Sequence, residues 1–318
     1  MPGPRPCFSL TAMRPPSDFD VIVVGAGSAG LSAALTLGRS RRRVLVLDGG
    51  PPRNAPAAHV HNLFTHDGTP PAELLRRGRE QLVPYAVALW PLEASTARAT
   101  ATGFALGLTD GTEATARALL LATGVADVLP ALPGFRELWG RGVYHCPYCH
   151  GWEIRDQRVA VYGQGAAGFH LAVLLHHWAP GPVLCSDGPA GLDAAQQATL
   201  QQLGIRVLET PLAALEAGAA GVQAVAFADG SRLPIDAVFA RVPQQQRTSL
   251  AAQLGCRFTD DGVYVQADAT GLTSVPGVYA AGDLTSPFQQ VSAAAAAGSG
   301  AAAMLNNELI FRDSTTAP

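Results

Sequence analysis

The sequence predicts an α/β protein built from two copies of one strand–turn–helix–strand unit, with the second copy inserted in the first. Three observations support this prediction. The pattern G-x-G-x-x-G occurs twice, at Gly25–Gly30 and at Gly163–Gly168. In each copy a hydrophobic strand precedes the glycines, a helical run follows them, and an acidic residue ends the next strand. The length of 318 residues suits two domains rather than one.

The first unit starts with a strand over residues 19–24, and a helical run over residues 31–37 follows its glycine-rich turn. The next strand, over residues 43–47, ends at Asp48. Glycines permit a tight turn and let backbone N–H groups approach a pyrophosphate, which the positive helix N-terminus attracts. A carboxylate placed like Asp48 accepts hydrogen bonds from ribose hydroxyls. We therefore expect a Rossmann-like dinucleotide-binding domain whose site contains Gly25, Gly27, Ser28, Ala29, Gly30 and Asp48.

Two later segments complete this first domain. Residues 119–121 form a buried strand that runs into a turn of small residues, Ala122, Thr123 and Gly124. Near the C-terminus a strand over residues 277–281 leads to Gly282 and Asp283. An Ala-rich helix over residues 289–305 would point its positive N-terminus at the group that Asp283 holds. We expect residues 18–126 and 246–318 to form the first domain, 127–245 the inserted domain, and 1–17 a disordered extension with Met1 or Met13 as the start.

The second unit repeats this arrangement inside the inserted domain. A strand over residues 159–162 leads into the second set of glycines, a helical run follows over residues 169–177, and a strand over residues 182–186 ends at Asp187. The inserted domain is therefore expected to resemble an NAD(P)-binding domain, with Gly163, Gly165, Gly168 and Asp187 at its nucleotide-like site.

The segment Cys146-Pro147-Tyr148-Cys149-His150 is the most distinctive in the chain. Two thiols separated by two residues can close a disulfide at the start of a helix, where the helix dipole and a nearby imidazolium lower the thiolate pKa. His150 follows the second cysteine and is a candidate proton donor and acceptor. Cys7, Cys185 and Cys256 are isolated, and we expect them to be ordinary thiols.

Other interpretations of the cysteine pair are a zinc site, a c-type haem attachment site (C-x-x-C-H) and a glutaredoxin-like module. A zinc site would need a second Cys/His cluster at suitable spacing, which the sequence does not contain, and we therefore expect no metal. Haem attachment requires an exported protein, and no export signal is visible. A glutaredoxin-like pair would lie near the start of a small separate domain, whereas Cys146 and Cys149 lie just ahead of the second glycine-rich strand. This position favours a redox-active disulfide.

With these elements the chain resembles the low-molecular-weight thioredoxin reductases from Asp18 to about Ile310. The resemblance implies FAD in the first domain, a homodimer, and a swivel between domains that lets the flavin face the disulfide and the nucleotide in turn. It also implies roles for single residues: Asp48 holds the adenosine ribose, Asp283 holds the ribityl chain, Gln290 and Val291 lie near the flavin ring, and Arg53 and Asn54 match the loop after the acid.

The chain departs from this family at two places. His150 stands where the family carries an acidic residue. The cations that grip the 2′-phosphate of NADPH are replaced by Ser186, Asp187, Gly188 and Pro189. NADPH use is therefore in doubt, and NADH is less disfavoured because Asp187 can accept its free 2′-hydroxyl. The C-x-x-C-H-G segment is similar to a divergent branch that includes dithiol oxidases of the gliotoxin and holomycin type and noncanonical flavin thioredoxin reductases.

The whole sequence narrows the partners further. The net charge is −3 and all 22 basic residues are arginines, so P-loop and Schiff-base lysine chemistry are excluded and nucleic acid is not expected. No apolar run is long enough to span a membrane, and we expect a cytoplasmic protein. We predict an FAD-dependent thiol/disulfide oxidoreductase. Its partner would be a thioredoxin-like protein or a small disulfide or dithiol, with a protein electron donor as one option. The alternatives are a dithiol oxidase that uses oxygen and a redox sensor without turnover.

Overall fold

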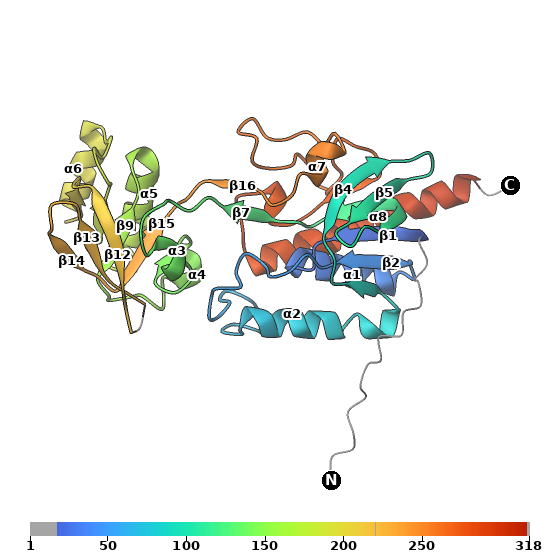
Figure 1. Ribbon diagram of the computed structural model, residues 1–318, viewed down its shortest axis with the longest axis horizontal. Coiled ribbons are helices and arrows are strands. Elements are labelled where there is room, and N and C mark those ends of the chain that lie inside the picture. The colour runs from blue at the N-terminus through green and yellow to red at the C-terminus, as the bar shows by residue number, and fades with distance from the viewer. Residues whose placement is uncertain (1–17, 220, 317–318) are drawn as a thin grey trace, which may run out of the picture.

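The computed structural model describes residues 18–219 and 221–316, so the expected N-terminal extension and Cys7 lie outside the described residues. Figure 1 shows two domains side by side, each with its own sheet and helices, joined by the two strands β7 and β16. Both sheets have parallel strands that alternate with helices. The predicted α/β class with two Rossmann-like domains is confirmed.

The sheet of the first domain runs in the order β3-β2-β1-β6-β5-β4, with β17 also paired to β6. Strands β1, β2, β3, β6 and β17 are parallel, and β4 and β5 extend the sheet as antiparallel strands. The bounds are β1 (Asp18–Val24), β2 (Val44–Leu47), β3 (Ala88–Trp90), β4 (Ala94–Ala99), β5 (Phe104–Leu108), β6 (Glu113–Leu121) and β17 (Val278–Ala280).

Side chains that alternate along β1 fill two separate cores. Val21 and Val23 pack against α1 and α8, whereas Ile22 and Val24 pack on the other face with residues of β4 and β5. At Gly298 of α8, a Cβ would lie 2.0 Å from the carbonyl oxygen of Ala29, so only glycine lets the two helices come this close. The helical elements of this domain are α1 (Ser28–Arg39), α2 (Pro71–Glu80), η1 (Val83–Tyr85), α7 (Leu250–Gln253), η2 (Asp283–Thr285) and α8 (Val291–Thr316).

Helix α8 differs from its prediction at both ends. It begins at Val291 rather than at residue 289, and it continues past residue 305 to Thr316. Leu309 is fully buried against the first domain, and Asp313 pairs with Arg42 and Arg117. These tertiary contacts hold the last turns in a helix, and the local sequence does not show them.

The sheet of the second domain runs in the order β11-β10-β9-β15-β8 and is parallel throughout. Helices α5 and α6 pack on one face, and an antiparallel sheet β12-β13-β14 and α3 pack on the other. The bounds are α3 (Phe135–Leu138), β8 (Val143–Tyr144), α4 (Pro147–His150), β9 (Val159–Tyr162), α5 (Gly165–Leu175), β10 (Val183–Cys185), α6 (Ala194–Gln202), β11 (Arg206–Leu208), β12 (Leu212–Gly218), β13 (Gly221–Phe227), β14 (Arg232–Pro234) and β15 (Ala237–Ala240).

The chain passes between the domains along β7 (Val125–Asp127) and returns along β16 (Gln244–Gln246). These two strands pair with each other in antiparallel register, from Asp127 with Gln244 to Val125 with Gln246. So short a two-stranded connection is a natural place for rotation of one domain against the other. In the part of the chain that the structure describes, we find no helix with the length and apolar character needed to cross a membrane.

Candidate functional site

The candidate site lies where three parallel strands of the first sheet end together. Val24 of β1 and Ala280 of β17 both pair with Leu121 of β6, so the residues that follow these strands lie at the same sheet edge. Ligands of open α/β sheets bind at the carboxyl ends of the strands. The topology thereby brings together the first glycine-rich turn, the 122–124 turn and Asp283, which are far apart in the sequence.

The first glycine-rich turn has the shape that a dinucleotide requires. Gly25 has a φ of 111°, and a Cβ on it would lie 2.3 Å from the carbonyl oxygen of Ala122. A Cβ on Gly30 would lie 1.8 Å from the carbonyl oxygen of Gly25, so glycine is needed for helix and strand to pack. At Gly27 an added Cβ meets nothing within 4 Å, so the open space there is available to a ligand. Helix α1 begins directly after Gly27 without a side-chain cap.

A single cavity extends from this turn toward the second domain. Most of the predicted residues of the flavin site and the disulfide line this cavity. Gly30 packs beneath the turn, and Asp48, Gly282 and Cys146 do not line the cavity. The predicted residues along its wall are Gly25, Gly27, Ser28, Ala29, Arg53, Asn54, Ala122, Thr123, Gly124, Cys149, His150, Asp283, Gln290 and Val291.

Asp48 and Asp283, the two predicted cofactor-binding carboxylates of the first domain, each have an arginine nearby. Asp48 accepts from Nη2 of Arg79 at 2.8 Å and from the N–H of Gly50 at 3.2 Å. Burial raises the pKa of Asp283, while the Arg53 guanidinium, 3.8 Å away, opposes that rise. Hydrogen bonds therefore fix the carboxylate of Asp48, whereas that of Asp283 has a single, longer ion pair.

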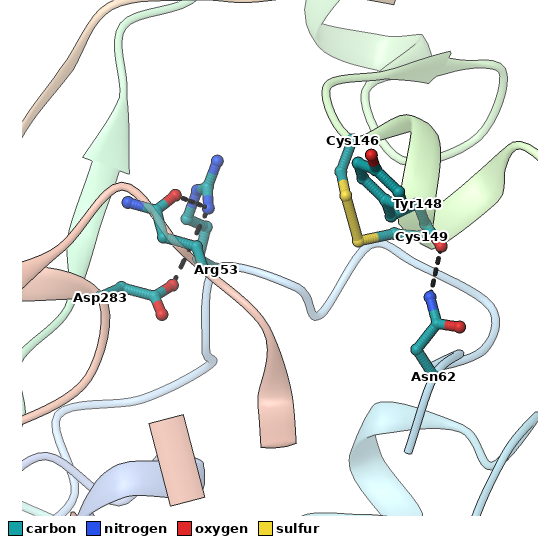
Figure 2. The surroundings of a disulfide bond; sticks show 7 residues. Arg53, Asn62, Cys146, Tyr148, Cys149 and Asp283 are labelled. Atoms are coloured by element: carbon teal, nitrogen blue, oxygen red, sulfur yellow. Dashed lines mark hydrogen bonds and ion pairs between the residues drawn. A yellow bond between two sulfur atoms is a disulfide. The ribbon is translucent and has the colours of Figure 1, made fainter. Parts of the chain in front are cut away.

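The disulfide lies at the end of the cavity that faces the second domain. Cys146 and Cys149 are joined, with their Cα atoms 5.3 Å apart, and Cys146 is the N-cap residue of the short helix α4. Figure 2 shows Arg53 and Asp283 on one side of this region and the disulfide on the other. The cavity thus connects the first glycine-rich turn with Cys149 of the disulfide.

His150 lies beside the disulfide in a largely buried position. Its ring stacks on Tyr144, with ring centroids 4.2 Å apart. Its Nδ1 is buried and has no hydrogen-bond partner among the described residues. Burial, and secondarily the charge of His61, lower the pKa of His150 to about 4. At neutral pH the ring is therefore a neutral imidazole.

Several residues of the site were missed in the sequence. His59, His61 and His145 also line the cavity, and Asp127 and Gln289 bind Arg53. Burial and the neighbouring Arg53 lower the pKa of His145 to about 4. His145 directly precedes Cys146, which was a usable signal. The others reach the site only through the fold, and no local pattern marks them.

The second glycine-rich turn packs like the first. A Cβ on Gly168 would lie 2.7 Å from Gly163, so helix α5 approaches its strand closely. Helix α5 begins at Gly165, before the predicted start at residue 169, because the glycine turn itself forms its first turn. The two turns therefore share the close approach of the last glycine to the first, although the left-handed glycine is Gly25 in one and Gly165 in the other.

The ligand-facing side of the second turn is different, because the segment after β10 folds over it. The N–H of Gly165 donates to the carbonyl oxygen of Ala190 at 2.7 Å. The side chain of Gln164 donates to the carbonyl oxygens of Ser186 and Asp187, at 2.7 and 3.3 Å. The carboxylate of Asp187 accepts the N–H of Leu212 at 2.7 Å. Groups that would meet a nucleotide are bonded within the protein.

Comparisons with known proteins agree with this geometry. The chain matches the pyridine nucleotide-disulphide oxidoreductase family over residues 19–298. The thioredoxin reductase tcpT of Claviceps purpurea is 32% identical over 305 residues, which cover 92% of this chain and 94% of that protein. A probable thioredoxin reductase of Arthroderma benhamiae is 38% identical over 158 residues, which cover 48% of this chain and 39% of that protein. The solved structure of HlmI has a TM-score of 0.90 and 36% identity, and covers 94% of this chain and 95% of that chain.

The family match covers most of the sequence, and both the fold and the disulfide agree with it. The chain therefore belongs to the pyridine nucleotide-disulphide oxidoreductases and is a thioredoxin reductase-like, FAD-dependent disulfide oxidoreductase.

Proposed function

We propose that the protein exchanges two electrons between bound FAD, the Cys146–Cys149 pair and an external disulfide or dithiol. One observation carries the proposal: Cys149 and His150 line the same cavity as Gly27 and Asp283. A redox-active disulfide and a dinucleotide in that cavity would lie within one continuous space.

The residues present fit FAD. Gly27 leaves open space where a pyrophosphate would approach the first turn of α1, and the uncapped helix N-terminus favours its negative charge. Asp48 would hold the adenosine ribose and Asp283 the ribityl chain, with Gln290 and Val291 near the ring. When bound, FAD supplies the two-electron exchange with the disulfide.

The exchange with an external dithiol takes place at sulfur. One substrate thiolate attacks a sulfur of the Cys146–Cys149 bond, which breaks to give a mixed disulfide and one cysteine thiolate. The second substrate thiol then attacks the mixed disulfide, so the substrate leaves as a disulfide and the protein keeps both cysteines reduced. The reverse sequence reduces an external disulfide. Since Cys149 lines the cavity and Cys146 does not, we assign Cys149 to the flavin side and Cys146 to the substrate side.

His150 is suited to move the proton in this exchange. The residue directly follows Cys149, and its buried Nδ1 has no competing partner among the described residues. A ring in this position can take the proton of an attacking thiol and return it to a leaving thiolate. Burial lowers the pKa of the ring to about 4, so it binds the proton weakly and releases it readily.

The second glycine-rich turn supports a source of electrons other than NADPH. Because Gly165, Gln164 and Asp187 are bonded within the second domain, a nucleotide must displace these contacts to bind. NADPH meets a further cost, since its 2′-phosphate would face Asp187 rather than an arginine. Loss of two charge-assisted hydrogen bonds weakens binding by about two powers of ten. NADH is less disfavoured, because it lacks the phosphate.

The same closed turn favours a second candidate function. If electrons do not enter from a nucleotide, an external dithiol is their natural source, and oxygen is an acceptor that needs no second site. The protein would then act as a dithiol oxidase. A thioredoxin-like protein or a small disulfide remains the proposed partner for the opposite direction, and a homodimer remains a prediction from the family resemblance.

The test is an anaerobic titration of the purified yellow protein with dithiothreitol, NADH and NADPH, followed by the visible flavin absorbance. We expect dithiothreitol to bleach the flavin and NADPH to be the slowest donor. Steady-state turnover with dithiol and oxygen, compared with turnover of NAD(P)H and a disulfide, then gives the direction of net flux. Rapid bleaching by micromolar NADPH, faster than by NADH, would contradict the assignment of the donor.

A further inference from the structure

One loop of the first domain reaches across to the disulfide turn of the second domain. This loop, which we call the clasp, comprises residues 60–69 and lies just ahead of α2 (Figure 1). An antiparallel bridge between Val60 and Thr69 closes its base, with the N–H of Val60 donating to the carbonyl oxygen of Thr69 at 2.9 Å. The clasp is therefore a closed unit with its own hydrogen bonds.

Asp67 holds the inside of the clasp in shape. Its Oδ1 accepts the N–H of Asn62 at 2.7 Å, and its Oδ2 lies 3.4 Å from Nδ1 of His61. The hydrogen bond from Asn62 is the main cause that lowers the pKa of Asp67. Asn62 has a φ of 59°, in the left-handed region that asparagine adopts more readily than most residues. Asp67 thus fixes the backbone of Asn62 and the ring of His61, and both residues extend their side chains out of the clasp.

These two side chains contact the disulfide turn itself. Asn62 donates from Nδ2 to the carbonyl oxygen of Tyr148, one of the two residues between the cysteines in the sequence (Figure 2). His61 places Nε2 3.3 Å from Oε1 of Glu153, a little beyond the second cysteine. Both contacts join the first domain to the second at the redox-active segment rather than at the hinge strands β7 and β16.

The position of these contacts gives them a specific effect. Cys149 and His150 line the cavity on the flavin side, and the backbone of Tyr148 is the point from which the turn is held there. Tyr148 is 58% exposed, and its ring has only an edge-to-face contact with Trp178 of the same domain, so burial of this residue holds the turn weakly. Since the domains are joined covalently by two short strands only, a contact at the turn restrains rotation about the hinge.

We propose that the clasp is a positioning element, in which His61 and Asn62 hold the disulfide turn at the flavin-side cavity and Asp67 orients both. Release of the clasp lets the turn move out and present its sulfur atoms to an external partner. The inference rests on the proposed function, because it concerns the Cys146–Cys149 disulfide that takes part in the proposed electron exchange. His61, Asn62 and Asp67 act through the turn and take no part in the sulfur chemistry.

The test uses Asn62→Asp combined with Glu153→Gln. These replacements preserve shape, remove the donor to Tyr148 and remove the charge opposite His61. The full-length variant is reduced with dithiothreitol, freed of reductant under nitrogen, and alkylated with iodoacetamide or with a polyethylene-glycol maleimide. Mass spectrometry of the Cys146–Cys149 segment gives the rate of alkylation by each reagent. The quantity compared is the ratio of the rate with the bulky maleimide to the rate with iodoacetamide. We expect this ratio to rise about threefold to tenfold, the range that one hydrogen bond supports.

Phe64→Ala is the matched control, because Phe64 lies in the same loop with its side chain 91% exposed. It should leave the ratio unchanged. The double variant should also keep wild-type flavin content and thermal midpoint, while dithiol-dependent flavin bleaching in a single turnover becomes slower. An unchanged alkylation ratio in Asn62→Asp/Glu153→Gln would contradict the proposal that the clasp positions the disulfide turn. The single variant Asn62→Ala gives a second, independent measurement of the same ratio.

The outcomes also separate this inference from the proposed function. If the wild-type flavin is not bleached by dithiol at all, the proposed function fails, while the alkylation ratio still reports on the clasp. If the wild type exchanges electrons and the ratio does not change, only the clasp fails.

Discussion

Arg53 and Asp127 form a bidentate ion pair where the chain leaves the first sheet, with both nitrogen–oxygen distances at 2.7 Å. The side chains are 15% and 7% exposed. Arg53 also donates to Gln289 at 2.8 Å, and Gln289 in turn hydrogen-bonds Gln244 of β16. This network connects both hinge strands to the residues that line the flavin-side cavity, so domain orientation and the cofactor site are linked through one arginine.

Removal of this arginine should destabilise the protein strongly. Arg53→Ala leaves Asp127 nearly buried without its bidentate partner, and loss of one member of such a pair costs about 3 kcal/mol. Urea unfolding measures the change. The control is Arg98→Ala, because the Arg98–Glu113 pair is 61% and 50% exposed and should be worth about 1 kcal/mol or less. Equal losses of unfolding free energy in the two variants would mean that the Arg53–Asp127 pair stabilises the protein no more than an exposed ion pair does.

Gly27→Ala should separate folding from cofactor binding. An added Cβ meets no protein atom within 4 Å, so the flavin-free variant should unfold at the same temperature as the flavin-free wild type. The same Cβ would enter the space that we assign to the pyrophosphate, so the ratio of flavin to protein absorbance should fall. Gly300→Ala is the control, since a Cβ there also meets nothing and the residue lies in α8 away from the cavity. Full flavin retention in Gly27→Ala would place the cofactor elsewhere.

His150→Ala should slow dithiol-dependent flavin reduction by about 10²-fold, the usual scale for one acid–base group. The physical reason is the loss of a neutral proton acceptor next to the disulfide. Stopped-flow absorbance under nitrogen measures the rate, and His177→Ala, at an exposed position, is the control. A rate that is unchanged at every pH would show that His150 only packs against Tyr144.

Folding stability should fall as the pH decreases from about 6.5 to 4. The pKa values of His145 and His150 are both lowered from 6.5 to about 4, because both rings are buried. Between these pH values the unfolded chain binds a proton on each ring and the folded protein does not, so acid favours unfolding. Each ring contributes about 1–3 kcal/mol to the change.

Urea unfolding of His150→Gln at pH 7 and pH 5 checks this assignment. The loss of stability between the two pH values should be smaller in His150→Gln than in the wild type, whereas His177→Gln should match the wild type. If His150→Gln loses as much stability as the wild type does, the ring is not a buried neutral group.

The sequence was sufficient to predict the two-domain architecture because its signals are local. Each glycine turn requires glycine at fixed places, as the 1.8 Å approach of a Gly30 Cβ to Gly25 shows. The strands around these turns are short hydrophobic runs that stand out in the sequence. The end of α8 was not predicted, because Leu309 and Asp313 are held there by residues from other parts of the fold.

The site could be predicted only in part, because some of its residues are brought together by the fold and not by a local sequence motif. Cys146, Cys149 and His150 form a contiguous motif, and the structure brings Cys149 and His150 to the cavity. His61 and Asp127 come from a loop and a hinge strand whose roles depend on how the domains are oriented. The low pKa of His150 could not be predicted from the sequence either, because it is caused by burial, which only the fold shows.

The central claim is that the Cys146–Cys149 pair passes electrons between an external dithiol and the bound flavin. Anaerobic stopped-flow with dithiothreitol tests it on the wild type, on Cys149→Ser and on Cys146→Ser/Cys149→Ser, each with its flavin content measured first. The account predicts bleaching in the wild type and none on the same timescale in either variant, with flavin retained in all three proteins. Bleaching of the double variant at the wild-type rate would contradict it.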